Sequence, residues 1–260
     1  MITFEVKGLV IRTTDIKESD RILNIFTEEF GLISALATGA RTLKSRKMSS
    51  TMQYCYSKFT VYKKGEYYRI KESELIESFY GIRESIEALA LAGYICEVLS
   101  DVTVAEAERD LLRLSLNSLY AISERKHPLQ KIKAAFEIRC AAILGFMPDV
   151  TACKECGERE GSFYFDIMGG SITCYECNKK RERAHTLPEN PHESSIISLL
   201  SETAKVALQY CIHSPLERIF SFNIPDEDME LFARASERYI VNQLERSYKT
   251  LEFYNDLMPL

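Results

Sequence analysis

The stretch that decides the N-terminal fold is residues 54–79, YCYSKFTVYKKGEYYRIKESELIESF. Tyr, Phe, Val, Ile and Thr are frequent in its two arms, residues 54–62 and 67–79, as is typical of β-strands. The link between the arms, Lys63-Lys-Gly-Glu66, is polar and contains a glycine, as short hairpin loops do. We therefore expect an antiparallel hairpin here.

Three further strands are expected upstream, at residues 4–13, 21–27 and 32–37. Turn-forming residues separate the strands, at residues 15–20, Gly31 and residues 39–50. A small barrel closes five short strands without leaving exposed edges. Residues 1–80 are therefore expected to form a five-stranded barrel of the oligonucleotide-binding (OB) type.

From Ile82 onward the apolar residues recur every three or four positions, which is typical of amphipathic helices. The expected stripes are Ile82, Ile86, Leu89, Gly93, Cys96 and Ser100; Leu112, Leu116, Leu119 and Ile122; and Leu129, Ile132, Phe136, Cys140 and Ile143. Asn190-Pro-His-Glu193 resembles a capping box that opens another helix. A last long helix is expected from Pro225 through the stripe Met229 to Leu251.

Two cysteine pairs interrupt the helical pattern. Cys153-Lys-Glu-Cys156 and Cys174-Tyr-Glu-Cys177 are seventeen residues apart, a spacing typical of zinc sites. Gly169-Gly170 predicts a hairpin that brings the pairs together, and Gly157 and Asn178 suit left-handed turns after each pair. Four thiolates leave no open position for a catalytic water, so we expect one structural Zn²⁺. The alternative is four reduced cysteines in the core, or a redox pair.

The predicted fold class is α+β with two domains. Residues 1–80 form the OB barrel, and residues 81–260 form an all-α domain that a zinc ribbon interrupts at about 150–185. The remaining cysteines stand singly in apolar surroundings and are expected to be buried: Cys55, Cys96, Cys140 and Cys211.

Charge is unevenly distributed along the 260 residues. The net charge is −5, yet residues 39–71 carry nine cations against Glu66 alone, a local balance of +8. Cations that neutralise phosphates, interleaved with aromatic rings that stack on bases, favour nucleic-acid binding. The alternative is that the tyrosines belong to the strand core and the charges to a solvated face. The candidate DNA-binding residues are Arg41, Lys44, Arg46, Lys47, Lys63, Lys64, Arg69, Lys71 and Tyr62.

Other classes of protein lack support in the sequence. Phosphate-loop, metalloprotease and nucleophile-elbow motifs are absent, so we expect no enzyme activity. No apolar stretch approaches the roughly 20 residues of a membrane span, and the N-terminus does not resemble a secretory signal. A cytoplasmic protein is expected. A zinc hydrolase and an RNA-binding OB protein are the competing hypotheses.

The ordered N-terminal motifs resemble the RecO family of bacterial recombination mediators. They are Lys7-Gly-Leu-Val-Ile-Arg12, Glu18-Ser-Asp-Arg-Ile-Leu23, Thr27-Glu-Glu-Phe-Gly-Leu32 and Ala37-Thr-Gly-Ala-Arg41. The quartet Cys153, Cys156, Cys174 and Cys177 matches the family's zinc-containing group.

The resemblance implies a nucleoid-associated role in RecF-pathway repair. It implies binding of single- and double-stranded DNA, annealing of complementary strands, and help in loading RecA onto strands coated by single-stranded DNA-binding protein (SSB). The implied protein partners are RecR and SSB. No hydrolysis and no membrane are involved.

Overall fold

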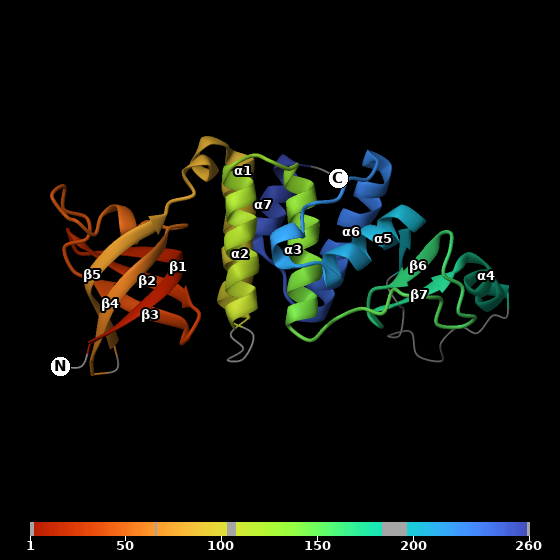
Figure 1. Ribbon diagram of the computed structural model, residues 1–260, viewed down its shortest axis with the longest axis horizontal. Helices are drawn as coiled ribbons and strands as arrows, with labels where there is room; N and C mark the ends of the chain where they lie inside the picture. Colours follow the sequence, from red (N-terminus) through yellow and green to blue (C-terminus); the bar gives the residue numbers. More distant parts are fainter. Residues whose placement is uncertain (1–2, 66, 103–107, 184–196, 259–260) are drawn as a thin grey trace. The chain divides into compact units, whose positions relative to one another are not determined.

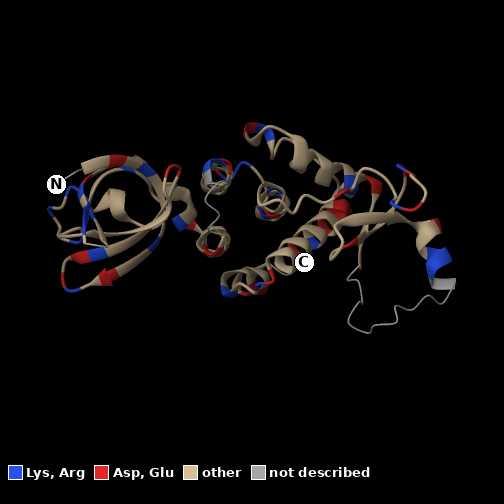
Figure 2. Cartoon of the chain, turned by 90° about the horizontal axis from the view of Figure 1, so that it is seen from below, with Lys and Arg blue, Asp and Glu red and all other residues tan. Residues whose placement is uncertain are grey.

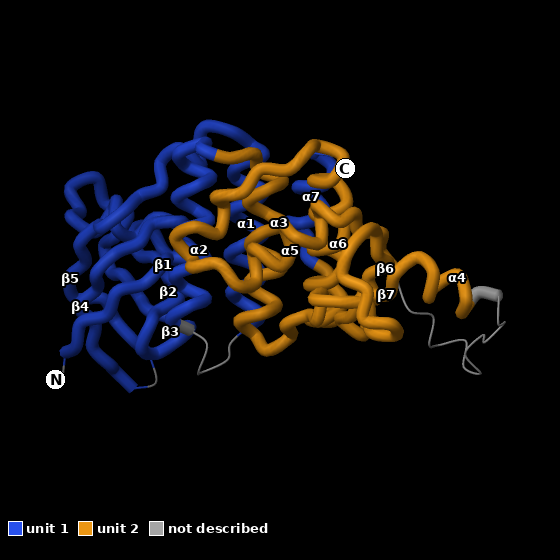
Figure 3. Tube along the Cα trace, turned by 45° about the vertical axis from the view of Figure 1, so that its right-hand side comes forward, with its two compact units in different colours: residues 1–126, 248–259 blue, residues 127–247, 260 orange. Residues whose placement is uncertain are grey.

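The computed structural model describes residues 3–65, 67–102, 108–183 and 197–258 (Figure 1). The chain divides into two compact units, coloured separately in Figure 3. One unit comprises residues 1–126 with 248–259, and the other comprises residues 127–247 with residue 260. The boundary at residue 80 that the sequence predicts stays a prediction.

The first unit begins with a closed five-stranded barrel of strand order β1-β2-β3-β5-β4. Its strands are β1 (Thr3–Ile16), β2 (Asp20–Thr27), β3 (Gly31–Ala37), β4 (Tyr56–Lys64) and β5 (Tyr67–Glu77). All neighbours are antiparallel except β3 and β5, which pair in parallel through two residues. The predicted OB-type barrel is confirmed, and each strand lies within three residues of its predicted bounds.

Alternating apolar residues fill the barrel interior, as the period of a strand requires. Val6, Leu23, Ile25, Phe59 and Val61 belong to this buried core. The long strand β1 pairs with both β2 and β4, which closes the sheet on itself. Gly8 permits the close approach of β1 and β2, because a Cβ atom there would lie 2.4 Å from Cγ2 of Ile25.

Helices complete the first unit: η2 (Tyr80–Glu84), α1 (Ile86–Asp101), α2 (Glu108–Ser123) and α7 (Lys249–Leu257). The hydroxyl of Ser85 accepts a hydrogen bond from the Ala88 N–H and so caps α1. The stripe predicted for α1 is wrong in detail: Ile86 is 52% exposed, whereas Leu91 and Ile95 are fully buried. Because α1 is packed around most of its circumference, its sequence does not single out one buried face.

The second unit contains α3 (Leu129–Ile143), α5 (Glu202–His213), η4 (Leu216–Arg218) and α6 (Asp226–Leu244). It also contains a three-stranded sheet of strand order β7-β6-β8. In the chain, helix α4 directly follows β7. These elements are β6 (Phe163–Asp166), β7 (Ser171–Cys174), α4 (Tyr175–Arg183) and β8 (Ile197–Leu200). The predicted hairpin at Gly169-Gly170 is confirmed as the β6–β7 connection.

Two helical expectations differ from the structure. The predicted last helix is two helices, because α6 ends at Leu244, the following Glu245 adopts the left-handed conformation (φ 51°), and α7 starts at Lys249. Tyr248, in the break, packs its ring on that of Tyr94 in α1, with centroids 5.6 Å apart. The predicted cap at Asn190 lies outside the described residues.

In the part of the chain that the structure describes, every helix is too short or too polar to cross a bilayer.

Candidate functional site

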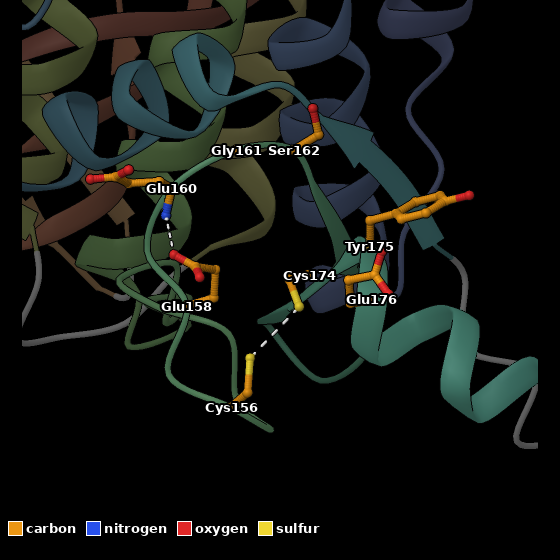
Figure 4. A pocket seen from close by; sticks show the side chains of 8 residues that line it. All are labelled: Cys156, Glu158, Glu160, Gly161, Ser162, Cys174, Tyr175 and Glu176. Atoms are coloured by element: carbon orange, nitrogen blue, oxygen red, sulfur yellow. Dashed lines mark hydrogen bonds between the residues drawn. The ribbon is translucent and has the colours of Figure 1, made fainter.

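Four cysteine sulfurs converge beside the β6–β7 hairpin. The Sγ atoms of Cys153, Cys156, Cys174 and Cys177 all lie within 4.8 Å of one another. The Sγ atoms of Cys156 and Cys174 are 3.7 Å apart, as the dashed line in Figure 4 shows. Sulfurs bound tetrahedrally to zinc at about 2.3 Å would be about 3.8 Å apart. The cluster can therefore hold a metal ion of this size.

The first cysteine pair lies in a tight turn. The N–H of Gly157 donates to the carbonyl of Cys153 at 2.9 Å, and Gly157 has a φ of +78°. The left-handed turn predicted at Gly157 is confirmed. Glu158 accepts the N–H of Cys153 at 2.7 Å, which closes the turn around the sulfurs.

The second pair uses a strand end and a helix instead of a second turn. Cys174 is the last residue of β7, and Cys177 lies in the first turn of α4. The left-handed conformation predicted at Asn178 is wrong, because Asn178 is helical. Residues three apart share one face of a helix or its entry, so a two-residue gap is satisfied without a left-handed residue.

The thiol pKa values reflect crowding of the four sulfurs. Burial raises the pKa of Cys153, but N–H donors from Cys174, Cys156 and Glu155 outweigh burial and lower it to about 6. The hydrogen bond with Cys156 is the main cause that raises the pKa of Cys177 to about 12. Neighbouring thiolates repel one another, so all four can ionise only when a cation binds them.

One wall beside the cluster is acidic. A pocket of about 500 Å³ opens beside Cys156 and Cys174, and Glu158, Glu160 and Glu176 line it (Figure 4). Carboxylates beside a cluster of thiolates repel phosphate. The single cysteines Cys55, Cys96, Cys140 and Cys211 are buried elsewhere.

The second candidate site is the basic loop, residues 39–47, which follows β3. Its start is fixed because the N–H of Gly39 donates to Oδ1 of Asp20 at 2.9 Å, and the N–H of Arg41 donates to the carbonyl of Ser19 at 3.0 Å. Nε of Arg41 lies 3.2 Å from Oδ2 of Asp15, and Oδ1 of the same carboxylate accepts a hydrogen bond from Arg21. The predicted DNA contact Arg41 is thus already paired.

Lys47 fixes the other end of the basic loop. Its Nζ donates to the carbonyl of Ile70 in β5 at 3.0 Å, and partial burial lowers its pKa. Arg69 and Lys71 flank Ile70 in the strand, so the structure brings these two predicted residues to the loop. Lys47 therefore holds the end of the loop against β5 and is not a free cation.

Lys44 and Arg46 are the free cations of the basic loop. Both side chains are exposed, and among the described residues neither forms an ion pair. Both are therefore available to phosphates.

The remaining predicted residues lie toward the β4–β5 turn. Lys64 pairs with Tyr67 at the turn, and Val61 pairs with Ile70, whose carbonyl binds Lys47. The turn is therefore about three residues, or roughly 10 Å, from the point where the loop is held. Lys63 lies 5.9 Å from the ring centroid of Tyr68, and Tyr62 is half-buried. Tyr67 is mostly exposed and is the ring here most accessible to a base.

Carboxylates that the sequence reasoning missed divide this basic surface. Glu72 and Glu74 lie just beyond the +8 stretch, and the register places them opposite Thr60 and Lys58. Lys58 is also paired with Glu5 of β1 at 2.8 Å. Figure 2 shows both signs of charge along the barrel strands. Strand pairing was the missing signal, because it joins acidic and basic segments that are separate in the sequence.

The fold defines the class of this protein. It is an OB-barrel protein with helices and a four-cysteine ribbon that could hold a metal ion. Its two halves match two family models, "Recombination protein O N terminal" at residues 1–79 and "Recombination protein O C terminal" at residues 83–252. The chain belongs to the RecO family.

Three relatives span nearly the whole chain, and each is named DNA repair protein RecO. The relative from Acetivibrio thermocellus is 34% identical over 97% of this chain and 96% of its own length. The relative from Clostridium kluyveri is 28% identical over 98% and 94%, respectively. The relative from Listeria innocua is 30% identical over 96% and 93%.

Proposed function

We propose that this chain is a DNA-repair recombination mediator that binds single- and double-stranded DNA and anneals complementary strands. Membership of the RecO family is the observation that carries the proposal. The exposed, unpaired cations of the basic loop support it, because a closed barrel with a free basic loop presents charge to a flexible phosphate backbone.

The proposed DNA contact centres on Lys44 and Arg46, with Arg69 and Lys71 beside the loop anchor. Both ends of the loop are held by hydrogen bonds, so little conformational entropy is lost when a strand binds. Lys63, Lys64 and Tyr62 extend the contact along β4 toward the turn. Phosphate contacts carry no base identity, as an annealing protein requires.

Zinc is the metal proposed for the four cysteines. The sulfur spacing and the all-thiolate ligand set suit Zn²⁺, which would hold the two cysteine pairs together and stabilise the ribbon. A full set of four protein ligands leaves no position for water. The proposed role of the ion is structural.

The proposed partners follow from the family resemblance: RecR, SSB, and RecA as the protein loaded onto DNA. The proposed location is the cytoplasm, associated with the nucleoid. The proposed action is to hold two strands together without breaking or forming covalent bonds, so no enzyme activity is expected.

An RNA-binding OB protein is the alternative function, and strand annealing distinguishes it. Affinity for single-stranded DNA and RNA of one sequence should be measured beside annealing of complementary DNA strands. Faster DNA annealing with the protein than without it, at an affinity for DNA at least equal to that for RNA, supports the mediator. Preference for RNA without DNA annealing would support the alternative.

A further inference from the structure

Leu43 is the most exposed large apolar side chain among the described residues. It is 93% exposed, whereas Met147, the next wholly apolar side chain, is 59% exposed. Single apolar residues on a surface are common and need no explanation by themselves. The backbone conformation at Leu43 and the charged residues beside it indicate a function for this side chain.

Leu43 lies at the tip of a hydrogen-bonded turn. The N–H of Ser45 donates to the carbonyl of Thr42 at 2.8 Å, which places Leu43 and Lys44 at the two central positions. The hydroxyl of Thr42 donates to the carbonyl of Gly39 at 3.0 Å, which supports the turn from one side. The central positions of turns favour Gly, Pro, Asn, Asp and Ser, so leucine is not there for the turn itself.

The loop holds the turn away from the barrel core. Asp20 binds the Gly39 N–H before the turn, and Lys47 binds the Ile70 carbonyl after it. Leu43 therefore contributes little to the barrel's own packing, in contrast to the buried Ala40 three residues earlier. Its apolar surface is available to a ligand that the loop binds.

The charges around Leu43 indicate the ligand. Lys44 and Arg46 are exposed cations on the same turn and its exit, so a bound phosphate backbone would pass beside the leucine. Aliphatic side chains that accompany such cations insert between stacked bases in proteins that distort DNA. Charge complementarity thus favours a nucleic-acid strand over an apolar protein surface.

We propose that Leu43 is a wedge that inserts between two adjacent bases of a DNA strand held by Lys44 and Arg46. The cations hold the backbone, and the leucine separates the stacked bases. Separating two stacked bases exposes their flat faces, against which the leucine packs. This inference rests on the proposed function, because it requires the basic loop to bind DNA.

The test uses the full chain and an oligonucleotide with one 2-aminopurine, whose fluorescence rises when it unstacks. Wild-type protein at saturation should raise the fluorescence severalfold. Leu43→Ser should remove most of this rise while the dependence of affinity on salt stays as in wild type. Leu43→Phe should restore the rise, since a larger apolar side chain also wedges. Ile86→Ser, which alters another exposed apolar residue, serves as the control.

Two results would overturn the wedge. One is no fluorescence rise with wild-type protein, and the other is an equal rise with Leu43→Ser. A Leu43→Ser protein that unstacks DNA normally but loses binding to a partner protein would assign the residue to protein docking. Lys44→Ala/Arg46→Ala with an unchanged salt dependence would instead show that the loop is not the DNA site, so failure of the proposed function is recognised separately.

Discussion

Oδ2 of Asp15 lies 3.2 Å from Nε of Arg41, so a carboxylate of β1 holds the first cation of the basic loop. Oδ1 of the same carboxylate accepts a hydrogen bond from Nε of Arg21 at 2.8 Å. A DNA phosphate that binds Arg41 must therefore compete with Asp15. The carboxylate positions the arginine and also opposes the approach of an anion.

Asp15→Asn should strengthen DNA binding. Removal of one negative charge beside the loop should raise affinity about two- to fivefold at low salt, and the difference should vanish at high salt because ions screen exposed charges. Fluorescence anisotropy across a salt titration measures this. Glu230→Gln removes an exposed carboxylate on α6 and should have no effect. Weaker binding by Asp15→Asn would mean that Asp15 chiefly orders Arg41.

The contact with Asp15 should persist well into acid. The hydrogen bond from Arg21 is the main cause that holds the pKa of Asp15 below its ordinary value. A carboxylate with a lowered pKa stays charged until the pH falls through that lowered value, so its effect is lost only at the acidic end. The difference in affinity between wild type and Asp15→Asn should therefore be constant between about pH 5 and pH 8.

Cys156→Ser tests the metal site with little disturbance of packing, because Cys156 is the exposed member of the cluster. Wild-type protein should carry about one zinc per chain, and the variant should lose most of it, because structural zinc binding contributes strongly to folding. Elemental analysis and thermal denaturation measure the two effects. Cys96→Ala, at a buried cysteine outside the cluster, should keep its metal. Metal-free wild-type protein would contradict the zinc proposal.

A buried ion cluster should stabilise the packing of α3 on α6. Nζ of Lys133 lies 2.9 Å from Glu137 and 2.5 Å from Glu237, and the Lys133 and Glu137 side chains are only 2% and 0% exposed. Lys133→Met should reduce the free energy of unfolding by about 3–5 kcal/mol, because it removes a buried cation that pairs with the buried carboxylate of Glu137. Urea denaturation measures this loss. Lys249→Met, at an exposed lysine, should change stability by less than about 0.5 kcal/mol.

The same cluster predicts a loss of stability in alkali. Burial lowers the pKa of Lys133, but Glu137 and Glu237 outweigh burial and raise it above the ordinary value. The stabilisation is fully present below the pKa of an unfolded lysine, about 10.4, and decreases as pH rises through the raised value.

The double variant Lys133→Met/Glu137→Leu should recover, at neutral pH, much of the free energy of unfolding that Lys133→Met loses. No recovery would show that packing, not charge, dominates.

The barrel and the cysteine ribbon were predictable because their signals are local. Strand alternation in residues 54–79 and the spacing of Cys153 to Cys177 each require only neighbouring residues. The break between Leu244 and Lys249 was not predictable, because the apolar stripe continues across it into α7. The short strand β8 forms because it pairs with β6, and no local sequence pattern predicts this pairing.

The candidate DNA site shows the same limit. The positive charge of residues 39–71 is visible in the sequence, but its partition into free and paired cations depends on tertiary contacts. Asp15 neutralises Arg41, and the Ile70 carbonyl holds Lys47, whereas Lys44 and Arg46 stay exposed. Within the basic loop, the structure therefore leaves Lys44 and Arg46 as the two cations that can be removed without loss of an anchor.

The most direct test of DNA binding and annealing through the basic loop is the annealing of complementary DNA strands by Lys44→Ala/Arg46→Ala across a salt titration. The account predicts slower annealing, and a slope of log affinity against log salt that is flatter by about 1.4, or about 0.7 for each lost phosphate contact. Arg234→Ala/Lys249→Ala, which removes two exposed cations elsewhere, should anneal like wild type. Wild-type annealing and an unchanged slope in Lys44→Ala/Arg46→Ala would contradict the account.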